Sequence, residues 1–415
     1  MALVLGLGLG LLERAIQPPS LSLDFLSTTT LDSRITFTRG SNATRVNSSG
    51  VIVTASNDVP RFDYDPVTLA AKGLLIEEAR TNLLTYSEQF DNAAWTKNNT
   101  TTTANATTAP DGATTADKLA ETATTAVHNA GQSITTTATA YNFSCYVKAA
   151  ERNFAFLYHT QTNAAVSVNL STGATGQPSG TVAPTSSSVT PVGNGWYRIN
   201  MTVTATAASN FFGVYVADTL TSVSYAGTAG SGIYVWGAQL EAGAFATSYI
   251  PTVASTVTRS ADVATMTGTN FSSWYNQTQG TFVVGADAFV DNSTIPYRPY
   301  GASDGTLSNI ISGYIYTAKW GASGLVGGVF QFDLSRVGSY AANIPAKSAL
   351  AYAANDFAFT VAGSTVATDT AGTLPTVDRL GIGNVAGFNF INGHIKTIAY
   401  FNTRLANAQL QSLTA

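Results

Sequence analysis

The amino-acid sequence predicts an all-β fold of two tandem antiparallel β-sandwiches. Many short segments alternate apolar and polar residues, which is the period of a strand with one buried face. These segments recur at short intervals and are separated by Gly, Pro, Ser and Asn, which favours a sandwich over a βαβ arrangement. The chain has 415 residues, enough for two or three domains with cores of their own.

The composition limits the classes of partner. Charged residues make up 11% of the chain, against roughly 25% in typical soluble domains, so Thr, Ser, Asn, Gly and Ala must cover the outer faces. Hydrophobic residues, at 45%, exclude a mostly disordered chain. The net charge of −4 provides no basic field, so we expect neither nucleic acid nor an anionic membrane as a partner.

The first element is an apolar N-terminal segment, residues 1–30. Residues 2–12 read ALVLGLGLGLL, which is too short to cross a bilayer because about 20 residues are needed. Leucines alternate with glycines here, and each glycine disfavours a helix by about 1 kcal/mol, so an extended conformation is favoured. We expect an anchor that packs against other copies or a partner; a frayed apolar tail is the alternative.

The next segment, residues 31–81, should form a leader of short strands and turns. It gathers many of the charged residues of an otherwise charge-poor chain. These charges either pair with a neighbouring molecule or form local salt bridges and turn caps, and we favour the local arrangement. The residues are Arg34, Arg39, Arg45, Arg61, Asp63, Asp65, Glu77, Glu78 and Arg80.

The first large domain is expected at residues 82–258. Its core strands are predicted at residues 141–149, 153–159, 165–170, 196–205, 211–217 and 233–240. In the last of these, strict alternation places Trp236 and Leu240 on one face and Val235 on the other. Cys145, the single cysteine, lies in a predicted core strand and should be a buried apolar residue rather than a nucleophile.

The second domain is expected at residues 259–415. A long strand carries apolar residues at every second position over 282–290. A hairpin follows over 356–370 and turns near 362–364. A helix over 404–413, with Thr403 as its N-cap, closes the domain.

Several motifs carry a resemblance to a known class of proteins. The patterns FTRGS.ATR, KGLLIEEARTNLL and WGAQLEAG…TSYIPT…TR.AD lie at residues 37–45, 72–84 and 236–262. They resemble motifs of phage virion structural proteins of the tail-fibre, head-fibre or spike type. The resemblance implies a position on the exterior of a phage particle, attachment to other virion proteins through the N-terminal segment, and assembly as a homotrimer.

Two further stretches resemble particular sandwich families. TNLLTYSEQFDNAAWTK, residues 81–97, resembles the opening of a carbohydrate-binding-module-like jelly roll. LGIGN…FINGHIK, within residues 380–396, resembles the end of a concanavalin-like or laminin-G-like sandwich. The resemblance implies a jelly roll at 82–258 and a concanavalin-like or laminin-G-like domain at 259–415, both with lectin-like surfaces.

The carboxylates of the second domain do not fit a glycosidase. Such an enzyme needs two carboxyl groups about 5–9.5 Å apart, yet the chain contains no glutamate after Glu241. Asp287 and Asp291 would face the same side of a strand about 13 Å apart, which is too far to cooperate. The sequence also lacks a P-loop and a zinc motif. We therefore expect no enzymatic activity and no cofactor.

Calcium is the one ion that the resemblance allows, since laminin-G-like sandwiches often bind it at a rim through carboxylate and backbone oxygens. Asp291, Asn292 and Asp304 are the candidate ligands. Solvated loop carboxylates are the alternative.

Sugar binding by a sandwich requires exposed aromatic faces with planar polar groups beside them. The candidates are Tyr297, Arg298, Tyr300, Trp320, Trp274 and Tyr158. The best of them flank Pro299 in a predicted loop, where burial is less demanded. The alternative for each is packing in a core or an interface.

Three functions follow from these observations as expectations. The favoured one is a phage fibre or spike protein with lectin-like domains that bind host-surface polysaccharide. A capsid or neck decoration protein that cements neighbouring subunits is the alternative within the structural class. A polysaccharide depolymerase is the alternative among enzymes.

Overall fold

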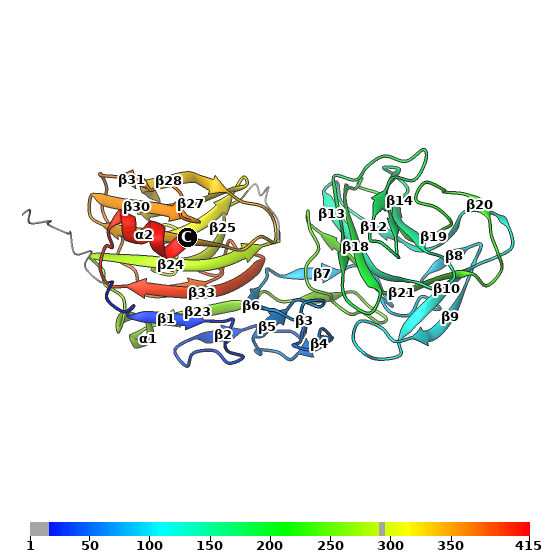
Figure 1. Cartoon of the computed structure of the whole chain (residues 1–415), viewed down its shortest axis with the longest axis horizontal. Coiled ribbons are helices and arrows are strands. Elements are labelled where there is room, and N and C mark those ends of the chain that lie inside the picture. The colour runs from blue at the N-terminus through cyan, green and yellow to red at the C-terminus, as the bar shows by residue number, and fades with distance from the viewer. Residues whose placement is uncertain (1–15, 290–294) are drawn as a thin grey trace, which may run out of the picture.

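The computed structural model describes residues 16–289 and 295–415. In that part of the chain most regular structure is β-strand, arranged as two sandwiches that lie side by side along the long axis (Figure 1). The predicted all-β fold of two antiparallel sandwiches is therefore confirmed. The expected N-terminal anchor sequence, residues 2–12, lies outside the described residues.

The first sandwich, the jelly roll, consists of two six-stranded sheets. Their strand orders are β17-β18-β13-β21-β10-β9 and β16-β15-β14-β19-β12-β8. The strands of the first sheet are β9 (Thr100–Thr107), β10 (Ala116–Glu121), β13 (Ala140–Ala149), β17 (Ser186–Pro191), β18 (Trp196–Thr204) and β21 (Gly232–Ala242). Those of the second are β8 (Thr96–Asn98), β12 (His128–Thr135), β14 (Phe154–His159), β15 (Ala164–Asn169), β16 (Thr175–Gly176) and β19 (Ser209–Ala217). A small ribbon pairs β11 (Thr125–Ala126) with β20 (Tyr225–Ala226).

The jelly-roll core lies between these two sheets. Each of the six predicted core strands is present, and Cys145 is fully buried among apolar side chains, as predicted. Strict alternation fails in β21, because Val235 and Leu240 both face the core whereas Trp236 packs on the opposite face. The cause is a bulge: the register with β13 shifts here, and Gly237 has a φ of 60°.

The second sandwich consists of an eight-stranded and a seven-stranded sheet. The first has the order β31-β30-β29-β24-β33-β6-β5, with β1 also paired to β33, and the second has the order β2-β23-β32-β25-β26-β27-β28. The strands of the eight-stranded sheet are β1 (Leu21–Asp24), β5 (Arg61–Tyr64), β6 (Ala71–Ile76), β24 (Gln279–Ala288), β29 (Ala346–Ala353), β30 (Asp356–Val361), β31 (Ala367–Asp369) and β33 (Gly393–Phe401). Those of the seven-stranded sheet are β2 (Thr36–Thr38), β23 (Val263–Thr267), β25 (Tyr297–Ser303), β26 (Ile310–Tyr316), β27 (Lys319–Val326), β28 (Val329–Ser339) and β32 (Arg379–Ile382).

The leader expected at residues 31–81 contributes strands to this second sandwich. β2 pairs with β23, while β5 and β6 extend the sheet beyond β33. The jelly roll is thus inserted between two parts of one sandwich. The chain enters and leaves it through β7 (Arg80–Asn82) and β22 (Val257–Arg259), which pair with each other. β3 (Ala43–Val46) and β4 (Ile52–Ala55) form a hairpin next to β5 (Figure 1).

The core of the second sandwich is rich in aromatic rings. Phe282 packs on Tyr300 and Tyr400, with ring centroids 4.8 and 4.7 Å apart. The closing helix α2 (Asn407–Thr414) begins later than predicted: Ala406 rather than Thr403 is the N-cap residue. The other helix, α1 (Thr269–Ser272), is a single turn. Neither is long and apolar enough to cross a membrane, and the described residues contain no other helix.

Candidate functional site

A buried cluster of charged residues joins the leader to the second sandwich. Its members are Arg39, Arg61, Glu77, Arg259 and Asp262, and their side chains are all inaccessible to solvent. Arg61 pairs with Glu77 at 2.7 Å and with Asp262, which also accepts a hydrogen bond from Arg39 at 3.0 Å. The charged leader residues of this cluster pair within the chain. Arg61 and Glu77 form a local pair as expected, whereas Arg39 and Arg61 also pair with Asp262, far along the chain.

The cluster also holds the segment that follows β21, residues 244–249. Ser248 donates from its backbone N–H to Glu77 Oε1 at 2.7 Å and from its hydroxyl to Oε2 at 2.6 Å. Burial alone would raise the pKa of Glu77, but the charges of Arg259 and Arg61 outweigh it and hold that pKa well below its usual range. The carboxylate is therefore ionised, and it fixes one wall of the adjoining cleft.

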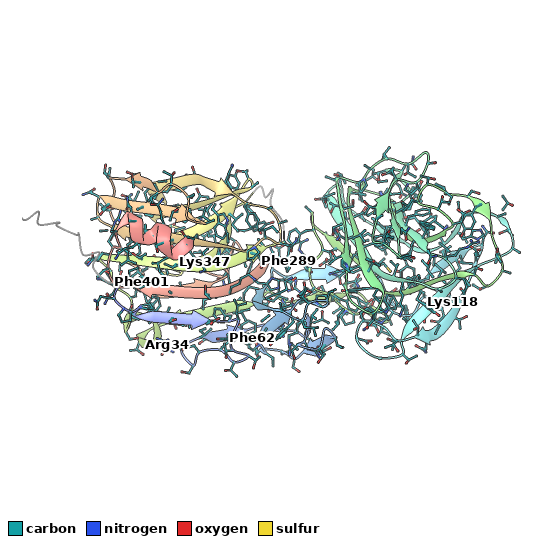
Figure 2. The ribbon with its side chains drawn as sticks, viewed as in Figure 1. Arg34, Phe62, Lys118, Phe289, Lys347 and Phe401 are labelled. Carbon is teal, nitrogen blue, oxygen red and sulfur yellow. The ribbon has the colours of Figure 1, made fainter. Side chains whose placement is uncertain are left out.

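This cleft lies where the jelly roll, the leader and the second sandwich meet. Its volume is about 420 Å³. Its walls are β3 and β5 of the leader, β17 and β18 of the jelly roll, residues 244–249, and Phe289 with residues 342–343 of the second sandwich. Figure 2 shows Phe289 on the side of the second sandwich that faces the jelly roll.

Three cationic side chains line the cleft. Arg45 donates from Nη1 to the backbone carbonyl of Phe62 at 3.2 Å. Arg198 donates to the carbonyl of Thr247 at 2.8 Å and to the hydroxyl of Ser144 at 3.0 Å. Lys72, on β6, is half-buried. These contacts orient the two guanidinium groups through neutral acceptors, and no salt bridge to either group is found among the described residues.

The single carboxylate of the lining is Asp63. Its Oδ1 accepts a hydrogen bond from the backbone N–H of Val46 at 2.7 Å, and its Oδ2 lies 3.1 Å from His394 Nε2. The other ring nitrogen of His394 lies 2.8 Å from Asp287 Oδ1. Burial alone would raise the pKa of Asp287, but His394 and Lys396 lower it by more than burial raises it, so the net shift is downward. With both nitrogens of His394 engaged by carboxylates, neither is available to activate a nucleophile.

Hydroxyl, amide and aromatic groups complete the lining. Ser186, Ser187 and Ser188 are exposed on β17, and Asn200 donates to the hydroxyl of Ser188. Tyr64, at the end of β5, is half-buried in the wall. The cleft thus combines an aromatic ring with planar polar groups and hydroxyls, which are the types of group that can contact a sugar.

The predicted sugar-binding loop around Pro299 is wrong. Tyr297, Arg298 and Tyr300 lie in strand β25, where Pro299 falls at an interruption of the register with β26 and needs no ladder hydrogen bond. Tyr300 is fully buried against Phe282. Burial lowers the pKa of Arg298 to about 10, and its Nη1 donates to Ser312.

The remaining aromatic candidates are divided between the two sandwiches. Trp320 and Trp274 are buried in the core of the second sandwich, so their ring faces are covered by protein. Tyr158 is half-buried on the outer face of β14, where it meets Tyr215 edge-on and donates to Asn163 Oδ1 at 2.7 Å. Of the six predicted residues, Tyr158 is therefore the one that the structure leaves partly open to solvent.

Only one of the three predicted calcium ligands, Asp304, lies within the described residues. Asp291 and Asn292 lie outside the described residues. Asp304 accepts hydrogen bonds from Thr306 at 2.7 Å and Asn309 at 2.8 Å. Burial alone would raise the pKa of Asp304, but these hydrogen bonds lower it by more, so the net shift is downward. Across residues 16–289 and 295–415, no three His, Cys, Asp or Glu side chains are grouped as metal ligands.

The fold and the cleft define an all-β, two-sandwich protein with a polar site between its domains. No protein-family profile matches the chain, and no curated protein matches it. Among solved structures, the CBM40 domain of a Ruminococcus gnavus sialidase bound to α2,3-sialyllactose is 17% identical, with a TM-score of 0.30 over 34% of this chain and 84% of that one.

Two further solved structures are similar at the same level. A leech intramolecular trans-sialidase is 19% identical, with a TM-score of 0.28 over 34% of this chain and 23% of that one. A pentraxin from Limulus polyphemus is 12% identical, with a TM-score of 0.24 over 33% of this chain and 70% of that one. At these TM-scores the similarity carries no argument about function.

Sequence reasoning missed the cleft. Its lining comes from several stretches that lie far apart in the chain, and local periodicity does not indicate which of them meet. One signal was present: Arg45, Asp63 and Lys72 belong to the charge-rich leader, and they are the members of that stretch whose charges face the cleft.

Proposed function

We propose that this chain is a structural protein of a phage particle, a fibre or spike of the tail or head, whose inter-sandwich cleft binds a host-surface saccharide. The motifs at residues 37–45, 72–84 and 236–262 support the phage assignment by resemblance. The observation that carries the binding assignment is the cleft itself. Its volume of about 420 Å³ falls within the roughly 300–1,000 Å³ of small-molecule sites.

Binding without hydrolysis is the chemistry that the lining supports. Asp63 is the carboxylate of this lining, and its two oxygens are engaged by Val46 and His394. A glycosidase of the usual type requires a second carboxyl group facing the first across the substrate. We therefore propose an adhesin without enzymatic activity. Release of reducing ends from host polysaccharide by the purified protein would contradict this.

A glycan array with the purified full chain tests the binding assignment. Tyr64→Ala should lower the affinity for the best array ligand about tenfold, because an aromatic contact of roughly 1.4 kcal/mol is lost. Tyr316→Ala is the matched control, since Tyr316 is an exposed tyrosine outside the cleft and 39% accessible. Equal losses in both variants, or no loss in Tyr64→Ala, would remove the cleft as the site.

The assembly is proposed on analogy. We expect a homotrimer attached to other virion proteins through its N-terminal segment. Light scattering should give three times the monomer mass of 43.1 kDa. Deletion of residues 2–16 should abolish incorporation into particles while leaving both sandwiches folded, and normal incorporation of the deleted chain would refute the anchor.

A decoration protein is the second candidate, and one surface feature favours it. Val329 and Phe330, at the tip of the β27–β28 hairpin, are 64% and 61% exposed. The neighbouring turn, which carries exposed Leu307, is held to the hairpin by the hydrogen bond from Gly328 N–H to the Ser308 carbonyl at 2.9 Å. Exposed apolar side chains gathered in this way are typical of a protein contact. A cementing role predicts that added protein raises the melting temperature of assembled shells and that Phe330→Ser abolishes the effect.

A further inference from the structure

We propose, on the basis of the proposed function, that the cleft selects an acidic saccharide, whose carboxylate or sulfate group is held by Arg45, Lys72 and Arg198. Three cations line the cleft against one carboxylate. In a chain with a net charge of −4 and only 20 lysines and arginines, this local excess of positive charge calls for a physical explanation.

The three cations differ from most of the arginines of the leader in having no acidic partner. Arg34, Arg39, Arg61 and Arg80 each pair with a carboxylate. Within the described residues, neither Arg45, Lys72 nor Arg198 lies within 4.0 Å of one. Lys72 acts on Asp65 and Asp287 only at longer range, where it helps to lower their pKa values. Its ammonium group is free to bind an anion in the cleft.

The acidic groups near the cleft are already engaged by the protein. Asp63 is held by Val46 and His394, as described above. Glu241, behind residues 244–249, is buried and accepts hydrogen bonds from both the backbone and the hydroxyl of Thr247. An anion entering the cleft therefore meets guanidinium and ammonium groups, and the nearby carboxylates are occupied or shielded.

The cationic groups are also positioned in advance. Arg198 packs over the ring of Tyr146, 5.4 Å from its centroid, and is tied to Thr247 and Ser144. Ser248, next to Thr247, is fixed by the buried carboxylate of Glu77. A site whose donors are already oriented loses little conformational entropy on binding. Guanidinium groups match the planar geometry of a carboxylate, and the hydroxyls of β17 suit the neutral part of a sugar.

The test compares acidic and neutral ligands on the same protein. The probes are trigalacturonic acid and its methyl ester, and a sulfated galactan oligosaccharide with its desulfated form, each titrated into the full chain at low salt. We expect at least one acidic probe to bind about tenfold more tightly than its neutral counterpart, because a charge-assisted hydrogen bond is lost in the latter. Added salt should reduce that preference.

Substitutions in the cleft test whether the preference for acidic probes arises there. Lys72→Gln and Arg45→Gln should each lower the affinity for the acidic probe about tenfold, whereas Lys72→Arg should retain it. Lys347→Gln is the matched control, because Lys347 is an exposed lysine of the second sandwich outside the cleft (Figure 2). Melting temperatures that equal that of the unmodified protein establish that the variants are folded.

Each of the other outcomes would refute one part of the proposal. Equal binding of acidic and neutral probes overturns the charge selection and leaves saccharide binding in place. Acidic binding that survives both Lys72→Gln and Arg45→Gln overturns the cleft as its location. If none of the four probes binds, acid selection is overturned; the proposed function falls as well only if the glycan array is also blank.

Discussion

The buried charge cluster predicts that Asp262→Asn severely destabilises the second sandwich. Asp262 Oδ1 accepts from Arg39 at 3.0 Å, and Oδ2 pairs with Arg61 and accepts from the backbone N–H of Glu77 at 3.0 Å. Without its charge, three buried guanidinium groups face Glu77 alone. Removing one partner of a buried ion pair costs about 3–5 kcal/mol, and each kcal/mol lowers the melting temperature of a domain of this size by about 2–4 °C.

The expected fall in melting temperature is therefore about 6–20 °C, measured by calorimetry at neutral pH. Asp356→Asn is the control: that carboxylate pairs with Arg404 at 2.8 Å, but its side chain is 55% exposed, so the loss should not exceed about 1 kcal/mol. The jelly-roll transition should move less than that of the second sandwich. A shift in Asp262→Asn no larger than in Asp356→Asn would refute the reasoning.

Three further predictions follow from buried groups. Because the folded state depresses the pKa of Glu77, the stability that this carboxylate contributes is complete above its ordinary pKa of 4.5 and is lost as the pH falls below it. Urea denaturation at a series of pH values should therefore show that the free energy of unfolding of Glu77→Gln falls less steeply in acid than that of the unmodified protein. Burial raises the pKa of Cys145 to about 12, so iodoacetamide should label it only in denaturant, and rapid labelling of the native protein would contradict its burial. Gly237→Ala should cost about 1–3 kcal/mol, since φ is 60° and the added Cβ would lie 2.9 Å from Tyr146 Cδ2; an unchanged denaturation midpoint would show that the bulge can relax.

The strands of both sandwiches were predictable because the alternation of apolar and polar residues is visible over a few neighbouring positions of the sequence. Ile199, Met201 and Val203 face the jelly-roll core in β18, as their alternation indicates. The bulge at Gly237 was not visible in this way. A single residue with positive φ reverses the faces of everything that follows it, and the letters Trp-Gly-Ala do not report that conformation.

The candidate site was not predictable for a related reason. The sequence around Pro299 predicts exposed aromatic residues because proline is typical of loops, but a proline at a register interruption is compatible with a buried strand. The cleft depends on contacts between residues far apart in the chain, such as Arg61 with Asp262 and Arg198 with Thr247. Periodicity indicates that these segments exist, and only the assembled fold brings them together.

The insertion of the jelly roll has a consequence for biosynthesis. Ser20 hydrogen-bonds to Tyr400, 380 residues further along the chain, and β1 pairs with β33 beside that contact. β1 is synthesised long before its partner β33, and the whole jelly roll is synthesised between them. The nascent chain therefore carries unpaired strand edges, open to aggregation, until β33 has been made. Shielding of those edges by a chaperone, or slow release from the ribosome, would be expected to govern the yield of native protein.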